Sequence, residues 1–303
     1  MMAELCLGTV QFGTNYGIQG NGKPREEEVF DILLYAVDHH IEMFDTASVY
    51  GKAEALLGEF IKKYPEPACK MKIVSKLRAD ALNKIPVDKW TTVIKQNAVQ
   101  SLKQMGINCF EAYLFHDSSQ IFNSDAVRAL SGLKQEGLSK AVGVSVYTPE
   151  EAMRALEYDE IDVIQVPYNV FDHRLDKCGF FIKAEERGVK VYARSVLLQG
   201  LVVMNPDNLP PTVSMAGDYL SRFDELCNEY NVSRYEAAFR YVLTKQGISC
   251  IVYGVDNITQ LTDYVELRKM NMSEEMIKQI DETFYDVPER LVNPVLWNQV
   301  GKQ

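Results

Sequence analysis

The 303-residue sequence has no run of about 18 apolar residues, no block of lysine and arginine, and no closely spaced pair of cysteines. Without a long apolar run, a membrane-spanning helix is excluded. The start, MMAELCLGTV, also lacks a basic segment followed by an apolar one, so we expect a cytoplasmic protein with no membrane partner. The six cysteines are scattered and far from the four histidines, which predicts reduced thiols and no metal site.

Basic residues are too few for a nucleic-acid-binding protein. The 42 acidic residues exceed the 32 basic ones and give a net charge of −10, which would repel a phosphate backbone. We therefore expect no nucleic-acid partner. With 47% hydrophobic residues, the chain can bury a large core, and its oligomeric state leaves no signal in the sequence.

Two common nucleotide-binding motifs are also missing. No G-x-G-x-x-G follows a strand, which argues against an open dinucleotide-binding sheet. Residues 17–24, GIQGNGKP, match G-x-x-x-x-G-K, but Pro24 stands where a phosphate-binding loop needs Ser or Thr. We interpret this stretch as a glycine-rich loop with proline at the start of the first helix.

What the sequence does contain is a regular alternation of short apolar runs and helical segments. The runs LCLGT, EMFDT, KIVSK, FEAYLFH, AVGVSV, DVIQVP, VKVYARS and SCIVYG predict eight strands. Apolar residues between them recur at helical spacing, first over residues 29–37 and then over residues 53–61. Eight such units with no linker predict an α/β fold, a single (β/α)8 TIM barrel over residues 1–303 that ends in a C-terminal segment.

In such a barrel the reactive groups lie where strands end, and four side chains here form a chemically coherent set. Asp45 ends the second strand, Tyr50 lies in its loop, Lys76 ends the third strand and His116 ends the fourth. An ammonium beside a phenol favours the phenolate, so we expect Lys76 to lower the pKa of Tyr50 and Asp45 to keep Lys76 charged. His116 could bind a substrate oxygen. The set predicts proton donation to a carbonyl oxygen, which leaves a hydride to be supplied to the carbon.

The stretches FDTASVYGKAEALLG, IVSKL and YLFHD, in this order and on these strands, resemble the aldo-keto reductase superfamily, and LGTVQFGTNYGIQGNGKP resembles the opening of a bacterial branch. The resemblance covers nearly the whole chain. It implies a TIM barrel that binds NAD(P)H without a Rossmann fold and reduces an aldehyde or ketone. By this resemblance Tyr50 is the general acid, Asp45 and Lys76 tune it, and His116 orients the carbonyl.

The resemblance also implies a set of cofactor-binding residues. Ser145 and Gln165 correspond to the residues that hold the nicotinamide carboxamide, although Val146 stands where many members have Asn. Arg194 replaces the aromatic residue that commonly stacks on the nicotinamide, and a cation there would favour the reduced ring. The remaining expected contacts, mostly in loops after strands, are Thr9, Ser195, Leu197, Gly200, Gly254 and Gln260.

Two departures from the family pattern stand out. After the eighth strand, NADPH-dependent relatives place Lys or Arg for the 2′-phosphate, whereas this chain has Gly254, Asp256, Gln260 and Tyr264. A doubly charged phosphate ester needs cations, so we hypothesise weak discrimination for NADPH or a preference for NADH.

The first strand also begins at about Leu5, which leaves no room for the usual β-hairpin under the barrel. Side chains or the C-terminal segment must therefore cover the barrel floor.

Substrate contacts are harder to predict, because loops shape the pocket. Phe12 and Tyr16 follow the first strand directly, and Phe171, with Tyr168 and Trp297, could line the mouth or simply fill gaps between helices. A small or sugar-derived carbonyl compound is the expected partner. Two alternatives stay open: a nicotinamide-binding barrel with a regulatory role, or a redox-neutral sugar-modifying enzyme that retains its cofactor.

Overall fold

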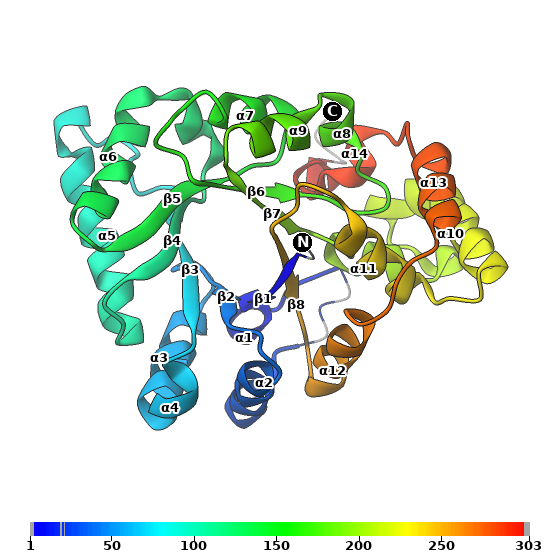
Figure 1. Cartoon of the computed structure of the whole chain (residues 1–303), viewed down its shortest axis with the longest axis horizontal. Helices are drawn as coiled ribbons and strands as arrows, with labels where there is room; N and C mark the ends of the chain where they lie inside the picture. Colours follow the sequence, from blue (N-terminus) through cyan, green and yellow to red (C-terminus); the bar gives the residue numbers. More distant parts are fainter. Residues whose placement is uncertain (1–2, 19, 21, 300–303) are drawn as a thin grey trace.

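Eight parallel strands form a closed barrel in a computed structural model that describes residues 3–18, 20 and 22–299 (Figure 1). Each strand pairs with the next in the sequence, and β8 closes the ring on β1. The predicted TIM barrel is confirmed, and every predicted strand is present. The strands are β1 Glu4–Gly8, β2 Met43–Asp45, β3 Lys72–Leu77, β4 Phe110–Phe115, β5 Ser139–Ser145, β6 Val163–Pro167, β7 Lys190–Arg194 and β8 Cys250–Gly254.

Helices surround the ring of strands (Figure 1). The α-helices are α1 Val10–Gly13, α2 Glu26–Asp38, α3 Ala53–Lys63, α4 Pro65–Ala68, α5 Trp90–Met105, α6 Ser124–Gln135, α7 Pro149–Ala155, α8 Arg174–Lys177, α9 Phe180–Glu186, α10 Gly217–Glu229, α11 Arg234–Thr244, α12 Ile258–Leu267, α13 Glu274–Thr283 and α14 Glu289–Val292. Six 3₁₀ segments join them: η1 Val87–Lys89, η2 Ser118–Phe122, η3 Leu198–Val203, η4 Pro206–Asn208, η5 Pro211–Ala216 and η6 Pro294–Gln299. Within the described residues, no helix is both long and apolar enough to cross a membrane.

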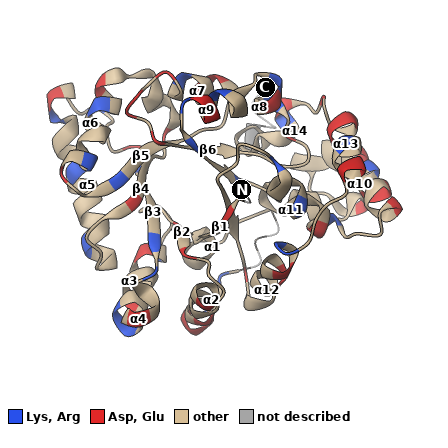
Figure 2. Cartoon of the chain, in the orientation of Figure 1, with Lys and Arg blue, Asp and Glu red and all other residues tan. Residues whose placement is uncertain are grey.

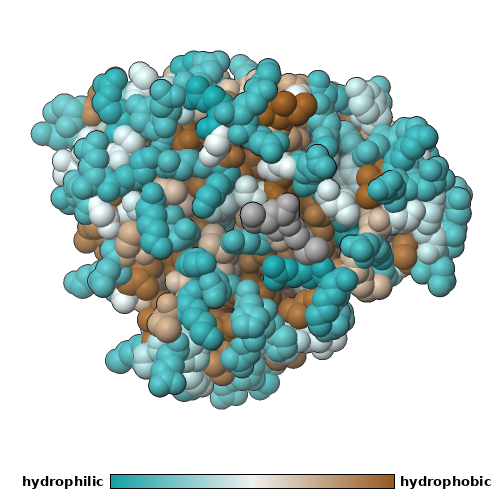
Figure 3. Space-filling view, viewed as in Figure 1, coloured by the Kyte–Doolittle hydropathy of each residue, from teal (hydrophilic) through white to brown (hydrophobic). Residues whose placement is uncertain are grey.

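The two predicted apolar stripes are buried, except that Ile61, at the end of the second stripe in α3, is only half-buried. In α2, Val29, Ile32, Leu33, Ala36 and Val37 are buried, as periodicity predicts for a helix with one face on a sheet. Figure 2 shows charged residues concentrated on the helices, and Figure 3 shows hydrophilic side chains over most of the rim of this face. Pro24 precedes α2 by two residues, and residues 19 and 21 of the glycine-rich stretch lie outside the described part.

Alternation along each strand decides which side chains enter the barrel. Cys6, Met43, Val74, Leu114 and Tyr192 pack together in its interior. A residue two positions further along a strand points the same way but lies closer to the carboxyl end. This rule places the predicted polar residues, which follow these apolar ones by two, in the layer at the mouth.

Side chains fill the floor of the barrel. No strand precedes β1 in the described part of the chain, and both Met43, the first residue of β2, and Tyr192, the middle residue of β7, are buried. The C-terminal segment lies at the other end, where Glu289 of α14 pairs with Arg174, a residue of the segment that follows β6. Of the two alternatives, side chains or the C-terminal segment, the side chains therefore close the floor of the barrel.

Candidate active site

A buried ion pair lies at the mouth, between the ends of β2 and β3. Lys76 Nζ is 2.6 Å from Asp45 Oδ1, and the two side chains are 1% and 5% exposed. Lys76 also donates to the Thr46 carbonyl oxygen at 3.0 Å, and Gln165 Nε2 donates to Asp45 Oδ2 at 2.8 Å. Because both carboxylate oxygens have donors, the pair can stay ionised away from water, although such a pair adds little net stability.

Tyr50 and His116 complete the set beside this pair. Lys76 Nζ lies 5.2 Å from the centre of the Tyr50 ring. The rings of Tyr50 and His116 meet edge to face, with centres 5.8 Å apart and an angle of 85°. The structure thus brings together a carboxylate, an ammonium, a phenol and an imidazole from four separate parts of the chain.

The pKa values in the absence of a ligand differ in one respect from the expectation. Burial raises the pKa of Tyr50, Lys76 lowers it and Asp45 raises it again, so the net direction is upward, not downward. The expected effect of Lys76 is present, but desolvation of the phenolate exceeds it. For Lys76, burial lowers the pKa, yet the charges of Asp45 and Tyr50 raise it more, so the amine stays protonated.

His116 is held neutral at physiological pH. Burial, followed by the positive charge of Lys76, lowers its pKa to about 4. A neutral imidazole next to Tyr50 can donate one hydrogen bond to a substrate oxygen without competing for the proton.

This shift predicts an acid-sensitive contribution to stability. Since the unfolded chain binds the histidine proton near pH 6.5 and the folded chain only near pH 4, the free energy of unfolding should fall as pH drops through this window. Urea unfolding measures the decrease in unfolding free energy between pH 7 and pH 4.5. This decrease should be smaller by roughly 2 to 3 kcal/mol in His116→Gln than in the wild type. His39→Gln, at the exposed residue that caps the C-terminal end of α2, is the control. A decrease in His116→Gln as large as that of the wild type would contradict the prediction.

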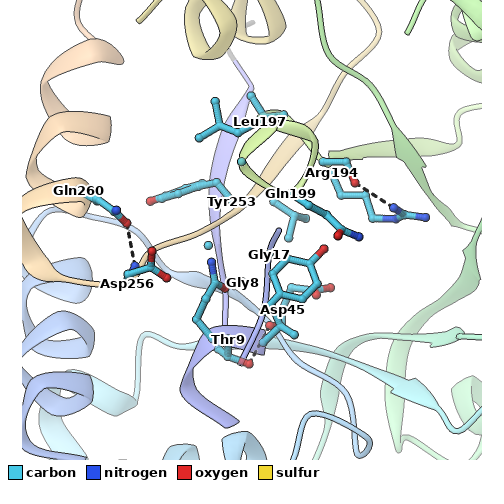
Figure 4. Close-up of a pocket in the computed structure, with 18 of the residues that line it drawn as sticks. Gly8, Thr9, Gly17, Asp45, Arg194, Leu197, Gln199, Tyr253, Asp256 and Gln260 are labelled. Carbon is cyan, nitrogen blue, oxygen red and sulfur yellow. Dashed lines mark hydrogen bonds between the residues drawn. The ribbon is translucent and has the colours of Figure 1, made fainter. Parts of the chain in front are cut away.

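An elongated cavity of about 330 Å³ begins at Asp45 and Tyr50 and extends between the loops after β1, β7 and β8 (Figure 4). Eight of the nine predicted cofactor residues line it, and the ninth, Ser145, hydrogen-bonds the lining residue Gln165. The eight are Thr9, Gln165, Arg194, Ser195, Leu197, Gly200, Gly254 and Gln260.

A chain of hydrogen bonds links the predicted carboxamide site to the ion pair. Arg194 Nε donates to Ser145 Oγ at 3.3 Å, and Ser145 Oγ donates to Gln165 Oε1 at 3.1 Å. The Gln165 amide in turn donates to Asp45. Ser145 and Gln165 together offer the donor and acceptor that a carboxamide requires, directly beside the ion pair.

The loop after β7 turns its backbone around the cavity. Ser195, Leu198, Gln199 and Gly200 have φ values of 60°, 48°, 56° and 90°, so successive peptide groups change direction sharply. Backbone N–H groups in such turns can form a concave anion site, which suits a pyrophosphate. Gln199 O also accepts from Ile18 N at 3.1 Å, so the loops after β1 and β7 meet.

The Gln11 side chain packs against the end of β8, where Gly254 has no side chain to obstruct it. A Cβ added to Gly254 would lie 2.2 Å from Gln11 Oε1, and that oxygen is buried without a hydrogen-bond partner among the described residues. Gly8 and Gly254 both line the cavity. A narrow passage with an unsatisfied acceptor fits an extended, hydroxyl-bearing molecule such as a dinucleotide.

At its far end the cavity is aromatic and lacks a cation. Of its described lining residues there, Tyr235, Tyr253 and Tyr264 supply ring surfaces, and Gln260 accepts from the Asp256 backbone N–H at 2.7 Å. No Lys or Arg of the described chain lines this end.

Several predicted substrate residues do not reach the cavity. Tyr16 lines it, but Phe12 is buried within the core. Phe171 packs against Phe223 and Phe284 with ring centres 5.8 and 4.9 Å away, because the helices after β7 and β8 cover it. Tyr168 stacks on Tyr241, and Trp297 donates to backbone carbonyls of the C-terminal segment. Gap filling therefore accounts for these three aromatics.

Four neighbours of the site were not predicted. Gln11 and Gln199 line the cavity. The guanidinium carbon of Arg194 lies 4.5 Å from the centre of the Tyr147 ring. Glu54 is a buried carboxyl that accepts from Ser75 and Ser101 at 2.8 and 3.0 Å and fastens the first turn of α3 beside β3. Only Gln11 had a sequence signal, since it lies three positions after the last residue of β1. In the ranges that the structure describes, no three ligand side chains are grouped to hold a metal ion.

The chain belongs to the aldo/keto reductase family, whose model matches residues 4–284. It is thereby an oxidoreductase of a family that acts on carbonyl compounds with NAD(P)H. The NADH-specific methylglyoxal reductase of Escherichia coli K12 is 24% identical over 302 residues, which cover 90% of this chain and 92% of that one.

Solved structures share the fold. An aldo-keto reductase of Bacillus halodurans in its holo form has a TM-score of 0.77 at 21% identity and covers 96% of this chain and 95% of its own. Glycerol dehydrogenase of Gluconobacter oxydans has a TM-score of 0.72 at 23% identity and covers 97% of this chain and 94% of its own. These two structural similarities show a shared barrel fold and carry no conclusion about substrate.

Proposed function

We propose that this protein reduces an aldehyde or ketone to an alcohol with NAD(P)H, and that Tyr50 is the general acid. The observation that carries the proposal is the buried Lys76–Asp45 pair against the Tyr50 ring at the edge of the cavity. A buried ion pair is expensive to maintain for structure alone, whereas it supports a phenol that must release a proton.

Each residue of the set has a distinct role in this proposal. The reduced nicotinamide, when bound, supplies the hydride to the carbonyl carbon. Tyr50 donates its proton to the carbonyl oxygen, and the Lys76 ammonium stabilises the phenolate that is left. Asp45 keeps Lys76 charged and directed, and neutral His116 hydrogen-bonds the same carbonyl oxygen.

The dinucleotide would extend from the barrel axis towards β8. Ser145 and Gln165 would hold the carboxamide, and Arg194 would lie against the nicotinamide. The loop that carries Ser195, Leu197 and Gly200 would face the pyrophosphate, and Gly254 and Gln260 would border the adenosine. The support is that these residues line one cavity, apart from Ser145, which hydrogen-bonds the lining residue Gln165.

We expect NADPH to bind no more tightly than NADH, because the loop after β8 offers Asp256 and no cation to a 2′-phosphate. Asp256→Arg should tighten NADPH binding by about tenfold, with NADH changed less. Fluorescence titrations with both dinucleotides measure this. A wild-type protein that binds NADPH tenfold tighter would contradict the prediction.

A panel of aldehydes, ketones and keto-sugars, followed through loss of reduced-nicotinamide absorbance, tests the reductase proposal. A protein that binds the dinucleotide but reduces none of them would favour a regulatory barrel. The hydrogen bond between Ile18 and Gln199 across the cavity gives one specific reason to test the cofactor-retaining alternative. In that case the purified protein should contain a dinucleotide that exchanges over minutes or longer.

A further inference from the structure

Arg194 is a cation that has no carboxylate partner among the described residues. Lys76, close to the same mouth, is paired with Asp45, whereas Arg194 donates to two hydroxyl groups and one backbone carbonyl oxygen. Its guanidinium is partly buried and lines the cavity. A guanidinium that lines a ligand cavity without a carboxylate partner among the described residues can bind an anionic group of the ligand.

The guanidinium is fixed in place by three of its five N–H groups. Nε donates to Ser145 Oγ at 3.3 Å, one terminal nitrogen to Ser195 Oγ at 3.0 Å and the other to the Val146 carbonyl oxygen at 2.8 Å. One face of the group stacks on Tyr147. One N–H on each terminal nitrogen has no recorded acceptor among the described residues, which leaves two donors for a ligand.

The place of the charge argues against the pyrophosphate as its main partner. Arg194 extends from β7 towards β5, whereas Asp256 and Gln260 mark the other end of the cavity (Figure 4). Burial raises the pKa of Tyr16 and Tyr50 and lowers that of His116. In addition, the positive charge of Arg194 acts to lower the pKa of all three groups. The guanidinium therefore acts on the groups around the carbonyl, not on the adenosine end.

Building on the reductase proposal, we infer that the preferred substrate is an oxo acid. Its carboxylate binds to the two remaining N–H groups at the edge of the Arg194 guanidinium, whose free face lies against the nicotinamide, while its carbonyl oxygen faces Tyr50 and His116. The net charge of −10 would repel such an anion in general, so a dedicated cation is needed to bind it. Planar guanidinium suits a carboxylate better than an ammonium does. Hydride addition to the carbonyl carbon and proton transfer from Tyr50 to its oxygen leave the carboxylate unchanged.

The test compares unbranched ω-oxo acids of two to five carbons with the neutral aldehydes of the same length, at saturating dinucleotide. We expect kcat/KM at least about tenfold higher for the best acid, and a loss of most of that preference in Arg194→Met. The ratio of kcat/KM for the acid to that for the neutral aldehyde, taken within one variant, does not depend on how tightly that variant binds the cofactor. Arg194→Lys should retain part of the acid preference. Arg187→Met, at a surface position paired with Asp159, should retain all of it.

A binding experiment separates this inference from the reductase proposal. Calorimetry with linear dicarboxylates of two to four carbons should show binding to the dinucleotide-loaded wild type that Arg194→Met loses. Equal ratios in wild type and Arg194→Met, or no acid preference at all, would overturn the inference while leaving carbonyl reduction intact. If no carbonyl is reduced, the reductase proposal fails, and Arg194-dependent dicarboxylate binding alone decides for or against the anion site.

Discussion

Tyr50→Phe is expected to reduce turnover by at least roughly a hundredfold, the low end for loss of a general acid, while dinucleotide binding stays nearly unchanged. The substitution removes only the hydroxyl. The ring keeps its edge-to-face contact with His116 and its position 5.2 Å from Lys76 Nζ, so the wall of the cavity is preserved. Both kcat and kcat/KM should fall, because the lost interaction belongs to the transition state.

Tyr113→Phe is the matched control for this experiment. Tyr113 is also buried, but its hydroxyl has no hydrogen-bond partner in the described structure and lies outside the cavity. The turnover of Tyr113→Phe should stay within about twofold of the wild-type value, since no hydrogen bond is lost. Unchanged turnover in Tyr50→Phe, on a compound that the wild type reduces, would remove Tyr50 from the proposed role.

Lys76→Met is expected to have the largest combined effect on stability and turnover. It leaves the Asp45 carboxylate buried without its ion partner, which costs about 3 to 5 kcal/mol of unfolding free energy. It also removes the charge that supports the Tyr50 phenolate, so turnover should fall by at least roughly a hundredfold. Urea unfolding and steady-state kinetics on the same samples separate the two losses.

Two further variants interpret that result. Lys140→Met breaks an exposed pair with Glu111 and should cost less than about 1 kcal/mol with normal turnover. The double variant Asp45→Leu and Lys76→Met removes both buried charges, so it should recover part of the lost stability but none of the turnover. Recovery of turnover in the double variant would show that the pair is structural only.

Much of the fold followed from local patterns. The spacing of apolar residues gave the buried stripe of α2, and the alternating runs gave all eight strands, because each helix or strand must bury one face. Strand alternation also explains why Asp45 and Lys76 meet: both follow an inward apolar residue by two positions. Hence the placement of Asp45, Lys76 and His116 at the strand ends could be predicted from this alternation, whereas Tyr50 lies in the loop after β2, which alternation does not position.

Contacts between distant loops could not be predicted in this way. The Gln165 amide reaches Asp45 across 120 positions, and Arg194 reaches Val146 across 48, and no local pattern encodes such distances. Phe171 was misplaced for the same reason, since its partners Phe223 and Phe284 come from later helices that only fold over it in three dimensions.

The sequence by itself determined the kind of barrel, the strands that carry the reactive groups and the chemical types of those groups. Only the tertiary structure decided their electrostatic state, because desolvation depends on what packs around each group: burial outweighs Lys76 in setting the pKa of Tyr50. It also decided that Arg194 donates to two hydroxyl groups and a backbone carbonyl oxygen, with no carboxylate partner among the described residues. Whether a charge is compensated depends on every neighbour in space, and most of those neighbours are remote along the chain.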